Sequence, residues 1–444
     1  MTDRTASGQL RWTGARSRLS AADERALFER STEAGAGVGD IGARTRAIIE
    51  RVRRDGDDAL RAMAAEFDGV TLDRLEVPMS QCRAALDALD PPLRRAMERS
   101  ATNIRRVHEF FRPLTQEIES EPGIVIGRRP DPLGRVGVYA PGGRAAYPSS
   151  VLMGVVPARV AGVGEIIVCS PPQRDTGVPS EVVLGAAALA GADRVFSLGG
   201  AGAIAAMAYG TTSLPRVDRI VGPGNAYVAE AKLQVASVVA IDSPAGPSEL
   251  LVLADDSADP VLIAREMLAQ AEHDPLAAVV AITTSESLAT AVLTALAALA
   301  PEQPRREIVA AALAAQGAVL WVDSLDEAIA FANRYAAEHL LLVVATADAV
   351  LERLRSSGTV FVGAYASVAF GDYMTGANHV LPTGGLARSY SGLSTLDFVR
   401  WTTYQRVTRD AAARLAHDVG IFADAEQLGG HALAARAWHL EARS

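Results

Sequence analysis

Two polar side chains that could bind a metal ion lie at the end of an apolar, helix-like segment. In LAQAEHDPLA, residues 268–277, Gln270 and His273 are three positions apart, and Asp274 and Pro275 end the segment. This spacing places both side chains on one helical face. A polar last turn, with histidine near the negative end of the helix dipole, is the simpler interpretation of such a pair. An amide oxygen and an imidazole are also suitable ligands for zinc.

Glu338 and His339 are adjacent in the segment AEHL, where a helical pattern changes to an apolar strand. Histidine can act as a base near neutral pH, and glutamate can activate water or orient an imidazole. An isolated Glu-His pair usually lies on the protein surface and has no catalytic role. This pair therefore indicates a site only if other functional groups lie beside it.

The segment FGDYMTGANHVLPTGG, residues 370–385, contains Asp372, Asn378 and His379 in a glycine-rich context. A long loop of this kind is commonly functional, although an Asx-rich connector is the simpler interpretation. Farther on, Glu426 and His431 lie on a candidate helix, where a solvated face would explain them. Two imidazoles, one carboxylate and one amide oxygen would form a zinc site if all were brought together, and these groups belong to Gln270, His273, Asp372 and His431. Spacing brings together only the first two.

Three glycine-rich segments could approach phosphate groups: YAPGGR (139–144), SLGGAG (197–202) and VGPGN (221–225). Each follows an apolar strand-like run, and ligands of parallel sheets bind beyond the carboxyl ends of strands. Each alone is explained by a tight turn, but three together favour a nucleotide or dinucleotide. Residues 200–205 also match G-x-G-x-x-A. No acidic residue follows at the expected strand end, so we treat that match as accidental.

These groups must be positioned by alternating strands and helices. Short apolar runs alternate with helical segments from about residue 135, and the rhythm restarts near 248. This pattern predicts an α/β fold with two similar Rossmann-like parallel-sheet halves, a helical N-terminal region and a helical C-terminal tail. We place the boundaries at 1–130 for an N-terminal arm whose helices pack on the second half, then 131–245, 246–370, and 371–444 for a connector and strandless tail.

Composition restricts the class of protein. The chain has 444 residues, 49% of them hydrophobic, and a net charge of -9 without a long basic run. Nucleic acid and membranes are therefore poor partners. Cys82 and Cys169 are too few and too isolated for a disulfide framework or a thiolate zinc site. The polar first residues lack an apolar stretch typical of a signal peptide, so we expect a cytoplasmic enzyme.

A set of motifs in fixed order carries a family resemblance over roughly residues 40–435. The motifs are YAPGGRAAYPSSVLM, VGPGNAYVAEAK, DSPAGPSE, AQAEHD, AAEHL, GDYMTGANHVLPTGG and SGLSTLDF. Together they resemble the histidinol dehydrogenase family. The resemblance implies oxidation of L-histidinol to L-histidine through histidinal, with reduction of two NAD, as the end of histidine biosynthesis. It also implies a homodimer with one zinc ion per active site.

The resemblance implies a role for each matched residue. It makes the first half the NAD side and the second half the zinc and catalytic side. Glu338 and His339 match the catalytic pair. The zinc ligands match Gln270, His273, Asp372 and His431. NAD contacts match Tyr139 and Asn225, and further substrate contacts match Ser248, His379 and Glu426. Since His431 lies in the helical tail, we expect this tail to cross to the partner subunit.

Two positions depart from the family pattern. Gly202 stands where the family usually has a glutamine that contacts NAD, and Ser367 replaces a common proline before GDY. Two alternatives remain open. One is a related zinc- and NAD-dependent dehydrogenase of another amino alcohol or of a diol, such as a sulfonated diol. The other, from a different class, is a zinc hydrolase or a metal-binding protein without catalytic activity.

Overall fold

The computed structural model describes residues 10–30, 38–142 and 146–441. The predicted loop YAPGGR therefore lies partly outside the described residues, at 143 and 144, as does the polar start of the chain. Contacts divide the chain into two units. The first comprises Met1–Phe111 and Gly134–Phe398, and the second comprises Arg112–Leu133 and Val399–Ser444.

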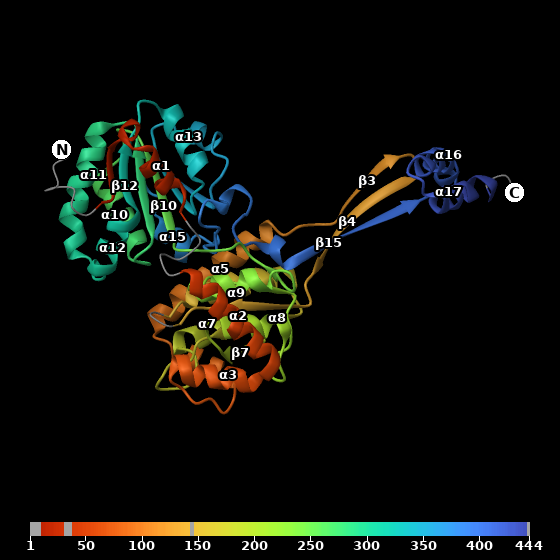
Figure 1. The fold of residues 1–444 in the computed structure, drawn as a ribbon, viewed down its shortest axis with the longest axis horizontal. Coiled ribbons are helices and arrows are strands. Elements are labelled where there is room, and N and C mark those ends of the chain that lie inside the picture. The colour runs from red at the N-terminus through yellow and green to blue at the C-terminus, as the bar shows by residue number, and fades with distance from the viewer. Residues whose placement is uncertain (1–9, 31–37, 143–145, 442–444) are drawn as a thin grey trace. The chain divides into compact units, whose positions relative to one another are not determined.

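A mainly parallel sheet forms the centre of the first half of the larger unit (Figure 1). Only its edge strand β2 runs antiparallel to its neighbour. These strands are almost entirely buried because helices cover both faces of the sheet, which explains their continuous apolar sequences. In spatial order the strands are β2 (Glu76–Val77), β7 (Arg194–Ser197), β6 (Glu165–Ser170), β5 (Arg135–Tyr139), β8 (Arg219–Val221) and β9 (Ala240–Ile241).

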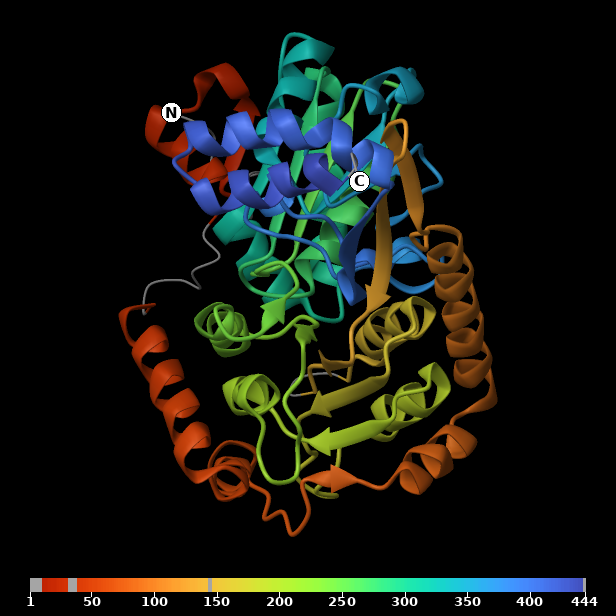
Figure 2. The ribbon, with the colours of Figure 1, turned by 90° about the vertical axis from the view of Figure 1, so that its right-hand side faces the viewer.

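The helices between these strands are α6 (Pro148–Ala161), α7 (Glu181–Ala190), α8 (Gly200–Tyr209) and α9 (Ala226–Val235). Helices that precede β5 in sequence pack on the same half: α2 (Val38–Asp55) on α8 and α9, α4 (Met79–Ala88) on α7, and α5 (Pro91–Phe110) on α6. Figure 2 shows α2 and α5 on opposite sides of this sheet.

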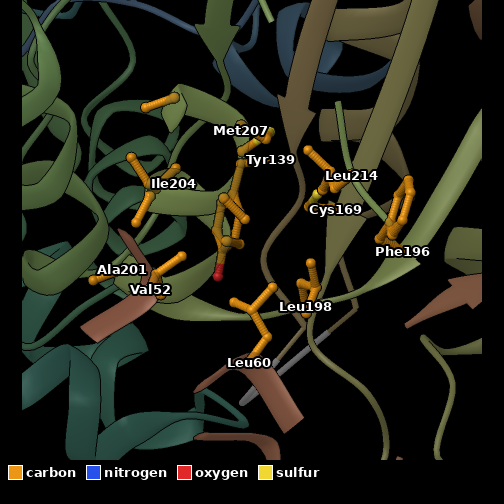
Figure 3. Packing of buried hydrophobic residues seen from close by; sticks show 14 of the residues in the cluster. Val52, Leu60, Tyr139, Cys169, Phe196, Leu198, Ala201, Ile204, Met207 and Leu214 are labelled. Carbon is orange, nitrogen blue, oxygen red and sulfur yellow. The ribbon is translucent and has the colours of Figure 1, made fainter. Parts of the chain in front are cut away.

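The expectation that the N-terminal helices pack on the second half is therefore wrong for α2, α4 and α5. Their amphipathic pattern predicts a buried face but does not specify the surface that covers it. Ile49 and Val52 of α2, with Leu60 of α3 (Asp57–Met63), join the core of the first half. Figure 3 shows Leu60 near Tyr139 and Ile204 in this core.

The second half has a sheet in which all strands are parallel. Its strands, in order, are β1 (Trp12–Ala15), β12 (Gly317–Trp321), β11 (Ala278–Thr283), β10 (Glu249–Ala254), β13 (His339–Val343) and β14 (Thr359–Val362). One face buries apolar side chains of α10 (Pro260–Ala271), α11 (Glu286–Leu299) and α12 (Arg306–Gln316), and the other those of α1 (Ala21–Phe28), α13 (Leu325–Tyr335) and α14 (Ala347–Leu351). The predicted fold class of two parallel-sheet halves is confirmed.

The second unit contains an antiparallel sheet and two helices. The sheet orders β15 (Val399–Val407), β4 (Ile124–Pro132) and β3 (Gln116–Glu121), and the helices are α16 (Arg409–Ala425) and α17 (Gly429–Glu441). The prediction of a strandless tail is wrong for 399–407, and the helical prediction is wrong for 116–132. The sequence VRWTTYQRV is rich in β-branched and aromatic residues, which favour strands when a partner strand is available.

Three smaller findings concern the burial of His108, the state of the two cysteines and the absence of a membrane-spanning helix among the described residues. His108 lies on the inward face of α5, where burial lowers its pKa to about 4. The reason is helical spacing, because Met97, Ala101 and Ile104 form the same buried stripe. Both cysteines are buried free thiols. Among the described residues, no helix is both long and apolar enough to cross a membrane.

Candidate active site

A cavity of about 1170 Å³ lies in the first unit, between segments of both halves. In the first half, its walls come from the loops that follow β5, β7 and β8, at the carboxyl ends of these strands. In the second half, they include Ser248, directly before β10, and Glu338 and His339 at the start of β13. The predicted site residues of the first unit line this cavity: Tyr139, Gly202, Asn225, Ser248, Gln270, His273, Glu338, His339, Asp372 and His379.

The end of α10 places Gln270 and His273 at the cavity wall. The helix ends at Ala271, and the Asp274 carboxylate accepts the backbone N–H of Leu276 at 2.9 Å, which fixes the following turn. Gln270 is buried, and within the described part of the chain its side chain has no hydrogen-bond partner. Its amide atoms are not among the fully buried atoms that lack a partner, so they face the cavity, where a ligand can reach them.

Asp372 lies on a short helix, α15 (Val368–Tyr373), and His379 lies in the loop beyond it. The His379 Nδ1 atom is 2.9 Å from the backbone oxygen of Asp372, to which it donates. Asn378 anchors the same loop by donating to the Met153 carbonyl of α6 at 2.8 Å. Burial lowers the pKa of His379. Burial tends to raise the pKa of Asp372, but the neighbouring imidazoles of His339, His379 and His273 outweigh it and lower that pKa.

Glu338 and His339 form a buried pair whose geometry assigns the imidazole tautomer. The Nδ1 atom of His339 is 3.1 Å from the carbonyl oxygen of Glu249, which can only accept a hydrogen bond. Nδ1 therefore carries the proton, and the basic atom of neutral His339 is Nε2. This Nε2 atom lies 3.6 Å from an Asp372 oxygen and has no hydrogen-bond partner in the described structure.

The carboxylates around His339 determine its basicity. Its Nδ1 atom is 3.5 Å from Glu338, whose Oε2 accepts the backbone N–H of Glu249 at 2.7 Å. Burial alone would lower the pKa of His339, but Glu338 and Asp372 outweigh burial and raise it. Burial raises the pKa of Glu338, and the charge of His339 offsets only part of that effect. The pair thus places an imidazole with a raised pKa beside one buried carboxylate, and a proton can be exchanged between them.

The loops after β5, β7 and β8 line the cavity with backbone and uncharged side chains, whereas the charged residues Arg44, Arg51, Glu66 and Asp68 come from α2 and the segment after α3. The Tyr139 hydroxyl accepts the backbone N–H of Gly200 at the start of α8, at 3.1 Å, and burial raises the pKa of Tyr139 to about 12. Asn225 caps α9 by accepting the N–H groups of Tyr227 and Val228 at 3.1 and 3.2 Å. Two helix N-termini therefore lie at this wall, an arrangement suited to an anionic ligand.

Gly202 lies on the first turn of α8 against Met63. A Cβ atom at Gly202 would be 3.1 Å from the Met63 sulfur and 3.5 Å from a Leu60 methyl group. A side chain there requires Met63 to move slightly, which a flexible methionine permits. Met63 and Leu60 of α3 thus occupy part of the space that a side chain at Gly202 would need.

Two predicted site residues belong to the second unit. Glu426 follows the end of α16, and His431 lies in the first turn of α17, where both are exposed. Among described side chains, no three from His, Cys, Asp or Glu already converge as a metal site. The prediction of four zinc ligands therefore remains a prediction.

Four buried charged residues next to the cavity wall were missed by sequence reasoning: Arg30, Lys232, Asp242 and Glu249. Lys232 forms a buried ion pair with Asp242. Lys232 also donates to the Gly222 carbonyl at 3.1 Å, while Asp242 accepts the Gly222 N–H at 2.7 Å. A sequence signal existed for two of them, because Lys232 is the only lysine in the chain and Glu249 begins a continuous apolar strand.

Comparison with known proteins identifies the family. The family model described as histidinol dehydrogenase matches residues 32–438. A histidinol dehydrogenase from Natronomonas pharaonis is 50% identical over 93% of this chain and 96% of its own length. One from Methanosarcina mazei is 46% identical over 93% of this chain and 95% of its own. The crystal structure of histidinol dehydrogenase from Elizabethkingia anophelis matches with a TM-score of 0.92 and 32% identity, covering 98% of this chain and 99% of that one.

These matches extend over nearly the full length of both partners, so they concern the whole protein and not a shared domain. They confirm the resemblance carried by the motifs, and with it the prediction of an oxidoreductase. The chain belongs to the histidinol dehydrogenase family.

Proposed function

We propose that this protein oxidises L-histidinol to L-histidine through histidinal, with two NAD molecules as hydride acceptors, in histidine biosynthesis. The observation that carries the proposal is His339, a residue of the cavity wall whose Nδ1 faces Glu338 and whose Nε2 has no hydrogen-bond partner in the described structure and lies 3.6 Å from Asp372. The substrate follows from relatives of nearly equal length that are named histidinol dehydrogenases. The net reaction consumes the alcohol, one water and two NAD, and yields the carboxylate, two NADH and three protons.

The first oxidation uses His339 as the base. Its Nε2 atom takes the proton of the substrate hydroxyl while a hydride leaves the same carbon, which leaves histidinal. NAD supplies the acceptor for that hydride. A positioned general base contributes about 100- to 10,000-fold to the rate of such a step.

The second oxidation requires water. Glu338 takes a proton from the water that adds to the aldehyde, and the resulting hydrate can then lose its hydride to a second NAD. Burial suits Glu338 to this role because a raised pKa makes its carboxylate a better proton acceptor than an exposed one.

We assign zinc ligation to Gln270, His273, Asp372 and His431. The donor set fits the ion, since zinc accepts imidazole nitrogens and carboxylate or amide oxygens. The Gln270 amide lies at the cavity wall and has no hydrogen-bond partner among the described residues. Bound zinc would orient the amino group and imidazole of the substrate. Chelation should abolish turnover and zinc should restore it, whereas His273→Ala should not recover at ordinary zinc concentrations. Full activity of a metal-free sample would overturn this assignment.

We assign NAD contacts to Tyr139, Asn225 and the backbone at Gly202. The Asn225 oxygen caps α9, so its amide NH₂ group remains free to donate to the nucleotide. We assign further substrate contacts to Ser248, His379 and Glu426. A carboxylate such as Glu426 suits a substrate that carries an ammonium group.

We also propose a homodimer in which the tail of each chain completes the site of its partner. The second unit, which carries His431, exposes Phe422 and Leu433 at 71% and 73%, as expected for a surface that another chain covers. Two inactive variants, His339→Ala and His431→Ala, are mixed under conditions that exchange subunits. In half of the resulting dimers one site receives both lesions and the other none, so activity should return to about a quarter of wild type. A mixture that stays inactive despite exchange contradicts tail exchange.

One assay tests the function directly. Purified protein is incubated with zinc, NAD and L-histidinol, and NADH is followed by absorbance, with other amino alcohols and a sulfonated diol as parallel substrates. Two NADH per histidinol, with histidine as product, is the expected result. Preference for another alcohol would identify a related dehydrogenase, and absence of NADH with every substrate would exclude this enzyme class.

A further inference from the structure

A buried ion pair lies directly behind the catalytic pair. Arg30 donates from Nε and Nη2 to the two carboxylate oxygens of Glu249, at 2.9 and 3.1 Å. Its Nη2 atom also donates to the Tyr335 carbonyl at 2.7 Å, and its guanidinium stacks 3.4 Å from the centre of the Tyr335 ring. Arg30 and Glu249 are both buried, and neither belongs to the residues that line the cavity.

Glu249 contacts both members of the catalytic pair through its backbone. Its N–H donates to Glu338 at 2.7 Å, and its carbonyl accepts from Nδ1 of His339 at 3.1 Å. The backbone position of this one residue therefore sets the direction of the Glu338 carboxylate and the tautomer of His339. Its side chain also accepts the backbone N–H of Gly384 at 2.7 Å, which ties it to the loop that follows His379.

Stability alone does not explain this ion pair. Replacing a buried ion pair by well-packed apolar residues is often neutral or stabilising, because both charges lose their hydration. A bidentate arginine does provide geometric precision, since its planar fork fixes the carboxylate in one orientation.

We propose that Arg30 is a positioning residue that acts through Glu249 on Glu338 and His339. The proposal rests on the function assigned above to those two residues. Arg30 follows α1 in the N-terminal segment, whose strand β1 joins the second sheet, and it precedes the residues 32–438 matched by the family model. The segment before the family match thus becomes part of the catalytic apparatus.

The test compares Arg30→Met, Arg30→Lys and the double variant Arg30→Met/Glu249→Gln with wild type. A displacement of about 1 Å costs about 100-fold in rate, so we expect Arg30→Met to lower kcat by about that factor. KM for histidinol and NAD should change less than about threefold, because neither residue contacts the cavity. Arg30→Lys keeps the charge without the fork, and about a tenfold loss of kcat is expected.

The double variant separates positioning from stability. It removes the unpaired buried charge left by Arg30→Met, so its Tm should recover while kcat stays low. Recovery of kcat together with Tm would show that the pair is only structural, as would a folded Arg30→Lys or Arg30→Met with wild-type kcat. Arg16→Met is the matched control, because Arg16 pairs with Glu24 in the same segment and does not contact Glu249. It should lower Tm without changing kcat.

A crystal structure of the double variant gives a readout that needs no substrate. Loss of the contact between His339 Nδ1 and the Glu249 carbonyl is the expected result, and an unchanged pair would overturn the proposal. If wild type does not oxidise histidinol, the proposed function fails, but this structural comparison still decides whether Arg30 positions the pair.

Discussion

The two halves of the larger unit share a sheet architecture but present opposite edges to the cavity. The first half contributes glycine-rich loops after the carboxyl ends of β5, β7 and β8, whereas the second contributes Glu338 and His339 at the amino end of β13. The carboxyl edge offers backbone N–H groups and helix N-termini, which suit a phosphate-containing cofactor. The amino edge offers charged side chains. Similar architecture thus does not imply similar chemistry, because the edge that faces the ligand decides which groups are available.

Each half also contains a buried ion pair next to residues that line the cavity. In the first half, Lys232 and Asp242 bind the two backbone groups of Gly222. In the second half, Arg30 pairs with Glu249, whose backbone contacts Glu338 and His339. The chain has 43 basic residues, and Lys232 is its only lysine. A compact ammonium fits between one carboxylate and one carbonyl, a geometry that a planar guanidinium does not reproduce.

The comparison predicts that changes in the second half affect kcat and changes in the first half affect KM for NAD. The largest effect is expected for His339→Ala, which removes the base. Both oxidations should slow by about 1,000-fold, measured separately with histidinol and with histidinal. Retention of either rate above a tenth of wild type would remove His339 from its role.

Glu338→Gln should slow the second oxidation more than the first. The variant amide oxygen can still accept the Glu249 N–H, so the site geometry is preserved, but it cannot take a proton from water. Oxidation of histidinal should slow by about 100-fold, and the alcohol step should slow less, because it loses only the charge that raises the pKa of His339. Histidinal should then accumulate, with one NADH formed per histidinol. Two NADH per histidinol at the wild-type rate would contradict this assignment.

Lys232→Met/Asp242→Asn tests the first half without leaving an unpaired buried charge. Weaker fixation of Gly222 should raise KM for NAD about tenfold, equivalent to about 1.4 kcal/mol, with kcat within a factor of three. Lys232→Arg should not behave as wild type, because its larger head group does not fit the same contacts. A fall in kcat with unchanged KM would break the proposed division between the halves.

Gly202→Gln should have the smallest effect. A restored amide should lower KM for NAD about fivefold, the value of about 1 kcal/mol for one hydrogen bond. Gly202→Ala is the control, because it introduces the contact with Met63 without the amide. If both variants raise KM equally, packing against α3 outweighs any contact with the nucleotide.

The sequence alone predicted the features that depend on local pattern. Alternating apolar runs and helical segments predicted two parallel sheets, because a strand buried on both faces must be apolar throughout. Helical spacing placed Gln270 and His273 together at the end of α10. The ordered motifs predicted the family, which the comparisons confirmed.

Only the tertiary structure decided which partners these local elements have. The pairing of β15 with β4, the packing of α2, α4 and α5 on the first half, and the contact of Arg30 with Glu249 all join residues far apart in the chain. The tertiary structure also decided that the carboxyl edge of the first sheet and the amino edge of the second sheet line the same cavity. An amphipathic or β-rich pattern states that a surface must be covered or paired, but the covering surface depends on the whole chain packing at once, which no local pattern records.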